Sequence, residues 1–123
     1  MATRNVFVYG ITADPDVMFL ITRIPADTEP ALLEDHDLAR SQNGSPTIRP
    51  SKGQRIWGLL IRDVTDSYVA RLDGYFGPNY ERKEVFVKSR GSTARAEAYV
   101  LGPHIIIPEG SVDLDGVQGD GDC

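Results

Sequence analysis

The sequence predicts a single small domain of the α+β class. Segments rich in β-branched and aromatic residues outnumber segments with helical periodicity, and both helical segments are short. A chain of 123 residues with 41% hydrophobic residues can build one modest core. We expect the domain to occupy residues 1–107. Residues 108–123 are acidic and rich in Gly and Asp, and we expect this tail to be disordered because it can bury little apolar surface.

The first predicted elements are a strand and a helix. Asn5–Tyr9 is typical of a buried strand, because it is dominated by β-branched and aromatic residues. Asp14 followed by Pro15 matches a helix N-cap with proline at the first helical position, and we expect this helix to end near Pro25. Its predicted apolar side consists of Val17, Phe19, Leu20 and Ile24.

The middle of the chain predicts two strands separated by a turn. Ala31–Arg40 mixes leucines with acidic residues and is compatible with a strand. Ser41–Pro46 has turn chemistry throughout, since it contains Asn, Gly, Ser and Pro. Gln54–Asp63 predicts a central strand and includes the longest apolar run of the sequence.

The last elements are a second helix and a hairpin. Thr65 is expected to open the helix and Gly77 to end it. Tyr80–Ser89 and Ala94–Leu101 then read as two strands joined by a tight turn around Gly91. The predicted buried face of the helix, at spacings of three and four residues, consists of Tyr68, Val69, Leu72 and Tyr75.

Charge and cysteine content exclude several classes of function. The formal net charge is −5, but five acidic residues lie in the last fifteen, so the domain itself is balanced and offers no footprint for nucleic acid. Cys123 is the only cysteine, which rules out a disulfide within the chain. The start lacks the apolar segment of a signal peptide, and no apolar run could span a bilayer. We therefore expect a cytoplasmic protein that does not bind membranes.

Two segments resemble the hallmarks of the γ-glutamylcyclotransferase-like superfamily, which includes the AIG2-like proteins. Phe7–Gly10 resembles the family's F-V-Y-G-[TS]-L loop, and Leu72–Val87 resembles its L-D-x-[YF]-E-G-x-x-Y-x-R-x-x-V-x-V stretch. Ile11-Thr12 replaces the usual Thr/Ser-Leu, and Phe76 stands where the family has its catalytic glutamate. Weaker matches follow the family order at Ala13–Met18, Ser45–Pro50, Arg55–Leu60 and Ala98–Val100.

The resemblance implies a fold and a pocket. The fold would be a small mixed twisted β-barrel with a few short flanking helices. In the family the loop after the first strand presents backbone N–H groups to a substrate carboxylate, which is a general way to bind an anion. The alternative is that Tyr9-Gly10 is only a strand end and a tight turn. The expected substrate-binding residues are Tyr9, Gly10, Ile11, Thr12, Phe76, Arg82 and Tyr99.

The substitution at Phe76 removes the family's proton carrier. Cyclotransferases form 5-oxoproline by attack of an α-amine on the γ-amide carbonyl of the same molecule, a reaction that needs a general acid and base. Phe76 can serve as neither, unless the register is different and this ring simply packs in the core. Replacement candidates are Tyr80, Glu81 and Glu84, although ring packing and solvated strand positions are their ordinary roles.

Three functions remain open from the sequence. The first is a divergent enzyme that binds a small, relatively apolar molecule and promotes cyclisation, isomerisation or elimination in specialised metabolism. The second is a conventional γ-glutamyl-amine cyclotransferase with a relocated acid, and the third is a non-catalytic binding protein. No P-loop, dinucleotide fingerprint or metal-ligand spacing is present, so we expect no cofactor and no metal. The sequence leaves open whether the protein is a monomer or a homodimer.

Overall fold

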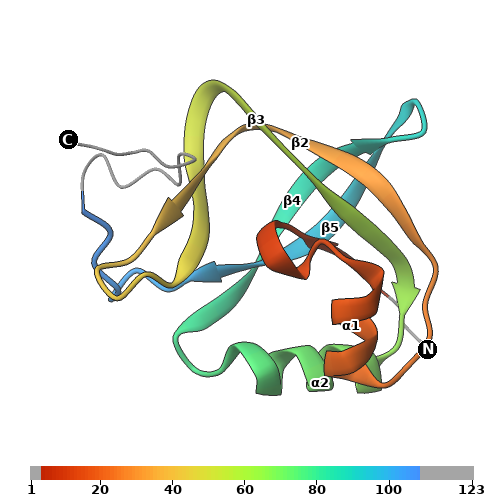
Figure 1. Cartoon of the computed structure of the whole chain (residues 1–123). Coiled ribbons are helices and arrows are strands. Elements are labelled where there is room, and N and C mark those ends of the chain that lie inside the picture. Colours follow the sequence, from red (N-terminus) through yellow and green to blue (C-terminus); the bar gives the residue numbers. More distant parts are fainter. Residues whose placement is uncertain (1–3, 109–123) are drawn as a thin grey trace.

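The chain forms a closed five-stranded β-barrel with two short α-helices beside it (Figure 1). The computed structural model describes residues 4–108. The α+β barrel that the sequence predicts is therefore confirmed. In chain order the elements are β1 (Arg4–Val8), η1 (Gly10–Thr12), α1 (Pro15–Thr22), β2 (Thr28–Arg40), β3 (Pro46–Val64), α2 (Asp66–Phe76), β4 (Tyr80–Ser89) and β5 (Ser92–Leu101).

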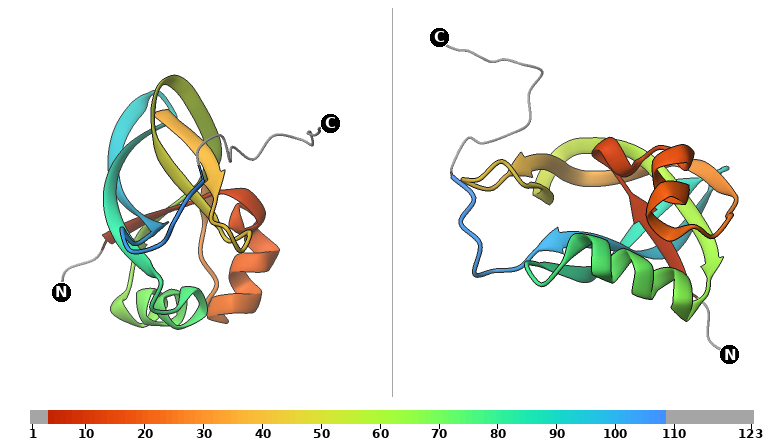
Figure 2. Two further views of the ribbon diagram at one scale, coloured as in Figure 1. Left: turned by 90° about the vertical axis from the view of Figure 1, so that its left-hand side faces the viewer. Right: turned by 60° about the horizontal axis from the view of Figure 1, so that its bottom comes forward.

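The barrel closes through a parallel pair of strands. The strand order is β1-β3-β2-β4-β5, and β1 pairs with β5 in parallel at Val6 and Glu97. All other neighbouring strands are antiparallel. Helices α1 and α2 connect strands that are not neighbours along this closed order, and both helices pack at one side of the barrel (Figure 2). The sheet is thus mixed, as expected.

The pairing of β2 with β3 is much longer than the sequence predicts. Strand β3 begins at Pro46 rather than Gln54, and β2 begins at Thr28 rather than Ala31. The residues before Gln54 are too polar to predict a strand by themselves. They become part of β3 because Pro46–Pro50 pair with His36–Arg40 of β2. A bulge interrupts the ladder where Asp35 has a positive φ of 58° and its Oδ1 accepts a hydrogen bond of 3.0 Å from Gly53 N–H.

Helix α1 starts as predicted but buries other residues. Asp14 accepts a 2.8 Å hydrogen bond from the Asp16 amide, and Pro15 occupies the first turn. The predicted apolar side is wrong at Phe19 and Leu20, which are 43% and 63% exposed, whereas Ile24 is half-buried and packs against a hydrophobic core. The fully buried residues of the helix are Met18 and Thr22. The helix ends at Thr22, before Pro25, because Arg23 adopts a left-handed conformation. The Thr22 hydroxyl bonds to the Met18 carbonyl at 2.9 Å, which allows its burial.

Helix α2 buries the predicted face over its first two turns only. The Thr65 hydroxyl caps the helix by accepting a 3.2 Å hydrogen bond from the Tyr68 amide, and Gly77 ends it with a φ of 83°. Tyr68, Val69 and Leu72 are buried as predicted. The prediction for Tyr75 is wrong, because its ring is 54% exposed.

Two hydrophobic cores hold the fold. The first fills the barrel, and the second lies between the outside of β1, β3 and β5 and the two helices. Strand β3 approaches β1 closely at Gly58, where an added Cβ would lie 2.2 Å from the Val8 carbonyl oxygen. The barrel core consists of Phe7, Tyr9, Ala31, Leu33, Ile48, Ile56, Leu60, Val85, Val87, Ala94, Ala96 and Ala98, and the helix-covered core of Val6, Val8, Met18, Ile61, Val64, Tyr68, Val69, Leu72 and Tyr99.

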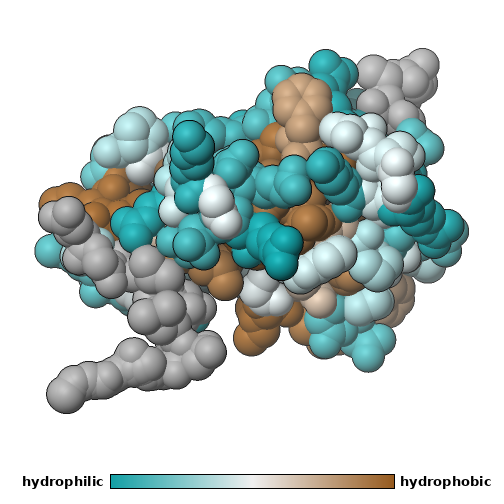
Figure 3. All heavy atoms as spheres, turned by 90° about the horizontal axis from the view of Figure 1, so that it is seen from above, coloured by the Kyte–Doolittle hydropathy of each residue, from teal (hydrophilic) through white to brown (hydrophobic). Residues whose placement is uncertain are grey.

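The chain after β5 crosses the end of the barrel at which β5 finishes. Residues 102–108 run toward the turn between β2 and β3, where Gln42 N–H donates to the Ile106 carbonyl at 3.3 Å (Figure 2). Apart from residue 108, the predicted disordered tail and Cys123 lie outside the described residues. Seen from above, hydrophilic side chains cover most of the barrel, with apolar ones visible between them (Figure 3). Within residues 4–108, neither helix has the length and apolar character needed to cross a membrane.

Candidate functional site

A small cavity lies between the helices and one end of the barrel. Its volume is about 210 Å³, and it is open to solvent on one side. Its wall is formed by the residue that follows β1, by η1, by the start of β3, by the last turn of α2 and by the start of β4. We call this the aromatic cavity, because four of its seven described lining residues carry aromatic rings. The lining residues are Tyr9, Ile11, Thr12, Pro46, Tyr75, Phe76 and Tyr80.

Phe76 is the centre of the ring cluster around this cavity. Its ring is stacked on that of Tyr99, with centroids 4.3 Å apart and an interplanar angle of 10°. Tyr75 and Tyr80 each lie 5.1 Å from Phe76, inclined at 87° and 59°. Phe76 is half-buried, so it serves as a wall of the cavity rather than as a fully enclosed core residue.

Two tyrosine hydroxyls of the cavity donate to backbone carbonyls. Tyr9 donates to the carbonyl of Tyr99, and Tyr80 donates to that of Pro46 at 2.6 Å. Burial raises the pKa of Tyr9, and the nearby Tyr80 raises it further. Burial likewise raises the pKa of Tyr80, followed by the effect of Tyr75. Both phenols are therefore weak acids whose protons are already held, which makes them poor proton donors near neutral pH.

The loop after β1 forms a single turn of 3₁₀ helix. Gly10 permits the turn with a φ of 65°, and the Thr12 hydroxyl donates to the Tyr9 carbonyl at 2.7 Å. The first amides of such a helix have no partner within it, and here they belong to Gly10, Ile11 and Thr12. The Ile11 side chain is 78% exposed and stands at the rim of the cavity.

A second hollow, with charged side chains, adjoins the aromatic cavity. It measures about 230 Å³ and shares the Tyr80 wall. Asp73 is its central group, since it accepts a 2.6 Å hydrogen bond from Tyr99 Oη and a 3.1 Å bond from Arg82 Nε. Burial and the carboxylate of Asp73 raise the pKa of Tyr99. This polar hollow is lined by Asp73, Gly77, Tyr80, Glu81, Arg82 and Tyr99.

The structure separates the predicted site residues into three groups. Tyr9, Ile11, Thr12, Phe76 and Tyr80 line the aromatic cavity, whereas Glu81, Arg82 and Tyr99 line the polar hollow. Gly10 lines neither. Glu84 lies elsewhere on the barrel surface, where it forms an ion pair of 3.4 Å with Arg95.

Sequence reasoning missed two lining residues. The sequence predicts a turn at Pro46 and a buried position for Tyr75, yet both residues line the aromatic cavity. The signal available for Pro46 was its place in the segment Ser45–Pro50, which resembles a family pattern. For Tyr75 the sequence carries no such signal, because the three-and-four spacing places it on the buried face of α2.

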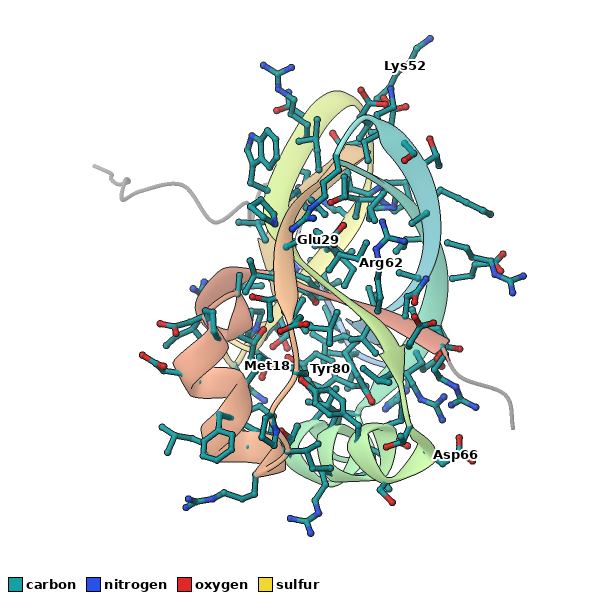
Figure 4. All side chains as sticks on the ribbon, turned by 90° about the vertical axis from the view of Figure 1, so that its right-hand side faces the viewer. Met18, Glu29, Lys52, Arg62, Asp66 and Tyr80 are labelled. Atoms are coloured by element: carbon teal, nitrogen blue, oxygen red, sulfur yellow. The ribbon has the colours of Figure 1, made fainter. Side chains whose placement is uncertain are left out.

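A third concavity is built around an ion-paired glutamate. Glu29 accepts hydrogen bonds from Arg62 Nη2 at 3.0 Å and from Ser89 Oγ at 2.6 Å, and Arg90 Nε lies 3.6 Å away. These contacts, led by the one with Arg62, hold the pKa of Glu29 below its usual value. In Figure 4 Glu29 and Arg62 lie higher on the barrel than Tyr80, which lies near the helices. This cleft of about 580 Å³ thus has its main charges satisfied by one another.

Metal binding gains no support from the four consecutive β2 residues Glu34, Asp35, His36 and Asp37. The Glu34 carboxylate pairs with Lys88 at 3.2 Å, and His36 Nδ1 lies 2.9 Å from the Glu34 carbonyl oxygen. In the part of the chain that the structure describes, no three His, Cys, Asp or Glu side chains come together as a metal site requires.

Comparison with known proteins places this architecture in a family. The family model described as "Gamma-glutamyl cyclotransferase, AIG2-like" matches residues 6–114. The chain belongs to this AIG2-like family. Among relatives from Arabidopsis thaliana, AIG2-like protein C is 28% identical over 80% of this chain and 59% of its own length. Protein AIG2 A is 35% identical over 69% of this chain and 51% of its own length. The chain thus spans little more than half of these curated relatives.

Solved structures confirm the AIG2-like fold. A solution structure of an Arabidopsis thaliana protein has a TM-score of 0.70 and 31% identity, and the match covers 82% of this chain and 63% of that chain. A structure named as a gamma-glutamyl cyclotransferase has a TM-score of 0.72 at 23% identity, covering 86% and 70%. A mouse AIG2-like protein gives 0.64 at 21% identity, covering 95% and 92%. The last two show likeness of fold alone.

Proposed function

We propose that this AIG2-like protein binds a small, relatively apolar molecule in the aromatic cavity and does not carry out the 5-oxoproline-forming reaction. One observation carries the proposal. None of the described residues that line the aromatic cavity has a carboxylate, and Phe76 forms its wall where the family resemblance places a glutamate. An apolar wall offers nothing to a charged α-amine that must leave water to enter.

The neighbouring acids support this proposal. Asp73 is held by Tyr99 and Arg82 in the polar hollow, behind the rings of Phe76 and Tyr80. Glu81 lines the same polar hollow and not the aromatic cavity. A general base has to lie within hydrogen-bond reach of the proton that it removes, and neither carboxylate lines the space where a substrate would sit.

In its enzymatic form, the proposal is a reaction that needs little proton transfer from side chains. Ring closure, isomerisation or elimination of a bound molecule fits this description, in the setting of specialised metabolism. The backbone amides of Ile11 and Thr12 would polarise a carbonyl group, as oxyanion donors do without a charged side chain. The rings would hold the substrate in a reactive conformation.

A non-catalytic binding protein is the second candidate. It is favoured by the hydroxyls of Tyr9 and Tyr80, which both donate to backbone carbonyls and have raised pKa values. A conventional cyclotransferase with a relocated acid ranks third, because it would require Glu81 to reach past Tyr80.

An assay of 5-oxoproline release tests the proposal. Full-length protein is incubated at neutral pH with glutathione, a γ-glutamyl amino acid and a γ-glutamyl amine, and the product is measured by chromatography with mass detection. We expect no release above the buffer control. Turnover that disappears in Glu81→Gln would overturn the proposal and identify a relocated acid. Native mass spectrometry of the purified protein then tests the binding half, through a retained small molecule.

A further inference from the structure

Three aromatic rings meet at one corner of the cavity. Phe76 is in the middle, with Tyr75 inclined at 87° and Tyr80 at 59°, each with its centroid 5.1 Å away. All three line the aromatic cavity, so their surfaces border the same space at different angles. We call these residues the aromatic corner. Aromatic pairs prefer offset-stacked and edge-to-face arrangements, and a corner of this kind offers both to one bound ring.

The aromatic corner is held in place from behind. The Phe76 ring rests on Tyr99, which is only 3% exposed and whose hydroxyl is bound to Asp73. The hydroxyl of Tyr80 is fixed by its 2.6 Å hydrogen bond to the Pro46 carbonyl. These side chains therefore lose little conformational entropy when a ligand binds, which favours a ligand that matches their existing arrangement.

The entrance of the cavity is apolar as well. Ile11 and Tyr75 are 78% and 54% exposed, and both line the cavity at its open side. Large apolar side chains that are exposed around a hollow are typical of a ligand-binding site. No charged side chain is among the described lining residues, so the wall provides no counter-ion for a charged group.

Resting on the proposed function of this cavity, we infer that its ligand carries one neutral, planar aromatic ring. The ring stacks on Phe76 on the side away from Tyr99 and meets Tyr75 or Tyr80 at an angle. An apolar cavity of about 150 Å³ is enough to hold benzene, so a volume of about 210 Å³ suits one ring with a short substituent. A fused polycyclic compound would extend out of the cavity.

A neutral ring fits better than an organic cation, although aromatic walls can attract both. The described lining of the cavity offers no carboxylate to balance a bound cation. The carboxylate of Asp73 is paired with Arg82 and is therefore a weak attractant.

A matched pair of probes tests the inference. Full-length protein is titrated with benzyl alcohol and with cyclohexylmethanol, which differ only in the aromaticity of the ring, while ¹H–¹⁵N spectra report on the amides of Ile11, Thr12 and Tyr75. We expect benzyl alcohol to bind about twofold to tenfold more tightly, the gain from one or two good ring contacts. Tetramethylammonium serves as the cationic probe and should bind more weakly than benzyl alcohol.

Two leucine variants locate the preference. Phe76→Leu keeps the wall apolar but removes the central ring, so the preference for benzyl alcohol should vanish while cyclohexylmethanol binds as before. Phe86→Leu is the control, because Phe86 is 59% exposed on the outside of the barrel, and it should keep the preference. If Phe76→Leu does not fold, Tyr75→Leu takes its place, since that ring is more exposed and should reduce the preference severalfold.

The outcomes separate this inference from the function on which it rests. Equal affinity for the two alcohols would overturn the aromatic preference and leave an apolar binding site standing. Tighter binding of tetramethylammonium would overturn it in favour of a cation site. Failure of every probe to shift the amides near the cavity would count against the proposed binding function itself.

Discussion

One face of helix α2 has different surroundings near the start of the helix and near its end. Tyr68, Val69 and Leu72 are at most 2% exposed and pack in the core beneath the helix. One turn later Phe76 is only half-buried, and it borders the aromatic cavity. The spacing from Leu72 to Phe76 is the same four residues that joins Tyr68 to Leu72, so periodicity assigns all three to one face. Hydrophobic periodicity therefore cannot distinguish a core residue from the wall of a binding site.

What lies opposite each end makes the difference. The core beneath the first two turns is filled by Val6 and Val8 of β1 and by Met18 of α1. At the last turn the facing residues are Ile11 and Thr12 of η1, with Pro46 of β3, and a space of about 210 Å³ remains among them. The sealed end serves stability and the open end offers a place for a ligand. Four experiments test this contrast.

The largest expected effect comes from placing a carboxylate at each end. Leu72→Glu should unfold the protein or cost more than about 4 kcal/mol, because Leu72 is 0% exposed and the charge would have no partner. Phe76→Glu should cost only about 1–2 kcal/mol, mainly for the lost stacking on Tyr99, since its carboxylate can reach solvent through the cavity. Denaturant unfolding measures both. Comparable losses in the two variants would show that Phe76 is ordinary core.

Glycine substitutions compare close packing inside the barrel with an open position on α2. Gly58→Ala should destabilise the protein by about 3 kcal/mol, because the new Cβ would lie 2.2 Å from the Val8 carbonyl oxygen and 2.7 Å from the Phe7 ring. Gly74→Ala is the control within α2, where a Cβ has nothing within 4 Å, and it should stabilise the helix by about 0.5–1 kcal/mol. Melting temperatures that move in the same direction for both would contradict this assignment.

Removal of the Tyr99 hydroxyl tests the hydrogen bond by which the ring beneath Phe76 is attached to Asp73 of α2. Tyr99→Phe loses the 2.6 Å hydrogen bond to Asp73, and we expect a cost of about 1 kcal/mol, since Arg82 still satisfies the carboxylate. Tyr75→Phe should leave stability unchanged, because the Tyr75 hydroxyl makes no hydrogen bond within residues 4–108. Chemical denaturation of both variants measures the difference, and an unchanged Tyr99→Phe would mean that the bond contributes nothing.

The smallest effect concerns alkaline pH. The pKa of Tyr99 is raised by burial and by Asp73, so the folded protein keeps this proton where an unfolded tyrosine, with a pKa of about 10, releases it. Its contribution is fully present below about pH 9 and declines as the pH rises, by about 0.4 kcal/mol between pH 9 and pH 10. Stability of the wild type should therefore fall by about this amount more than that of Tyr99→Phe over the interval. Parallel curves would argue against the raised pKa.

Much of the fold follows from local chemistry. Asp14 with Pro15 and Thr65 with Gly77 mark helix ends that any tertiary context would respect, because side-chain oxygens satisfy the first amides and glycine tolerates a positive φ. The hairpin of β4 and β5 follows equally from alternation around a short turn. The first half of β3 could not be predicted in this way, since its polar residues become a strand only through pairing with β2.

The candidate site was predictable in its parts but not in its assembly. The family resemblance points to Tyr9, Thr12 and Phe76, and all three line one cavity. It also points to Tyr99 and Arg82, which lie in the adjoining polar hollow because the Phe76 ring stacks on Tyr99. Alternation along β4 indicates that Glu81 and Glu84 face opposite sides, but it does not show that both are exposed.

The sequence by itself therefore determined the order of the elements, the helix caps, the inward side of the hairpin and the membership in a fold family. These depend on short-range chemistry, in which each residue acts on neighbours a few positions away. Tertiary structure alone decided which faces of the helices are covered, where the barrel closes, and that a space remains beside Phe76. These features depend on how segments distant in the chain pack together. The local sequence around Phe19 and Tyr75 therefore does not show that both side chains are exposed.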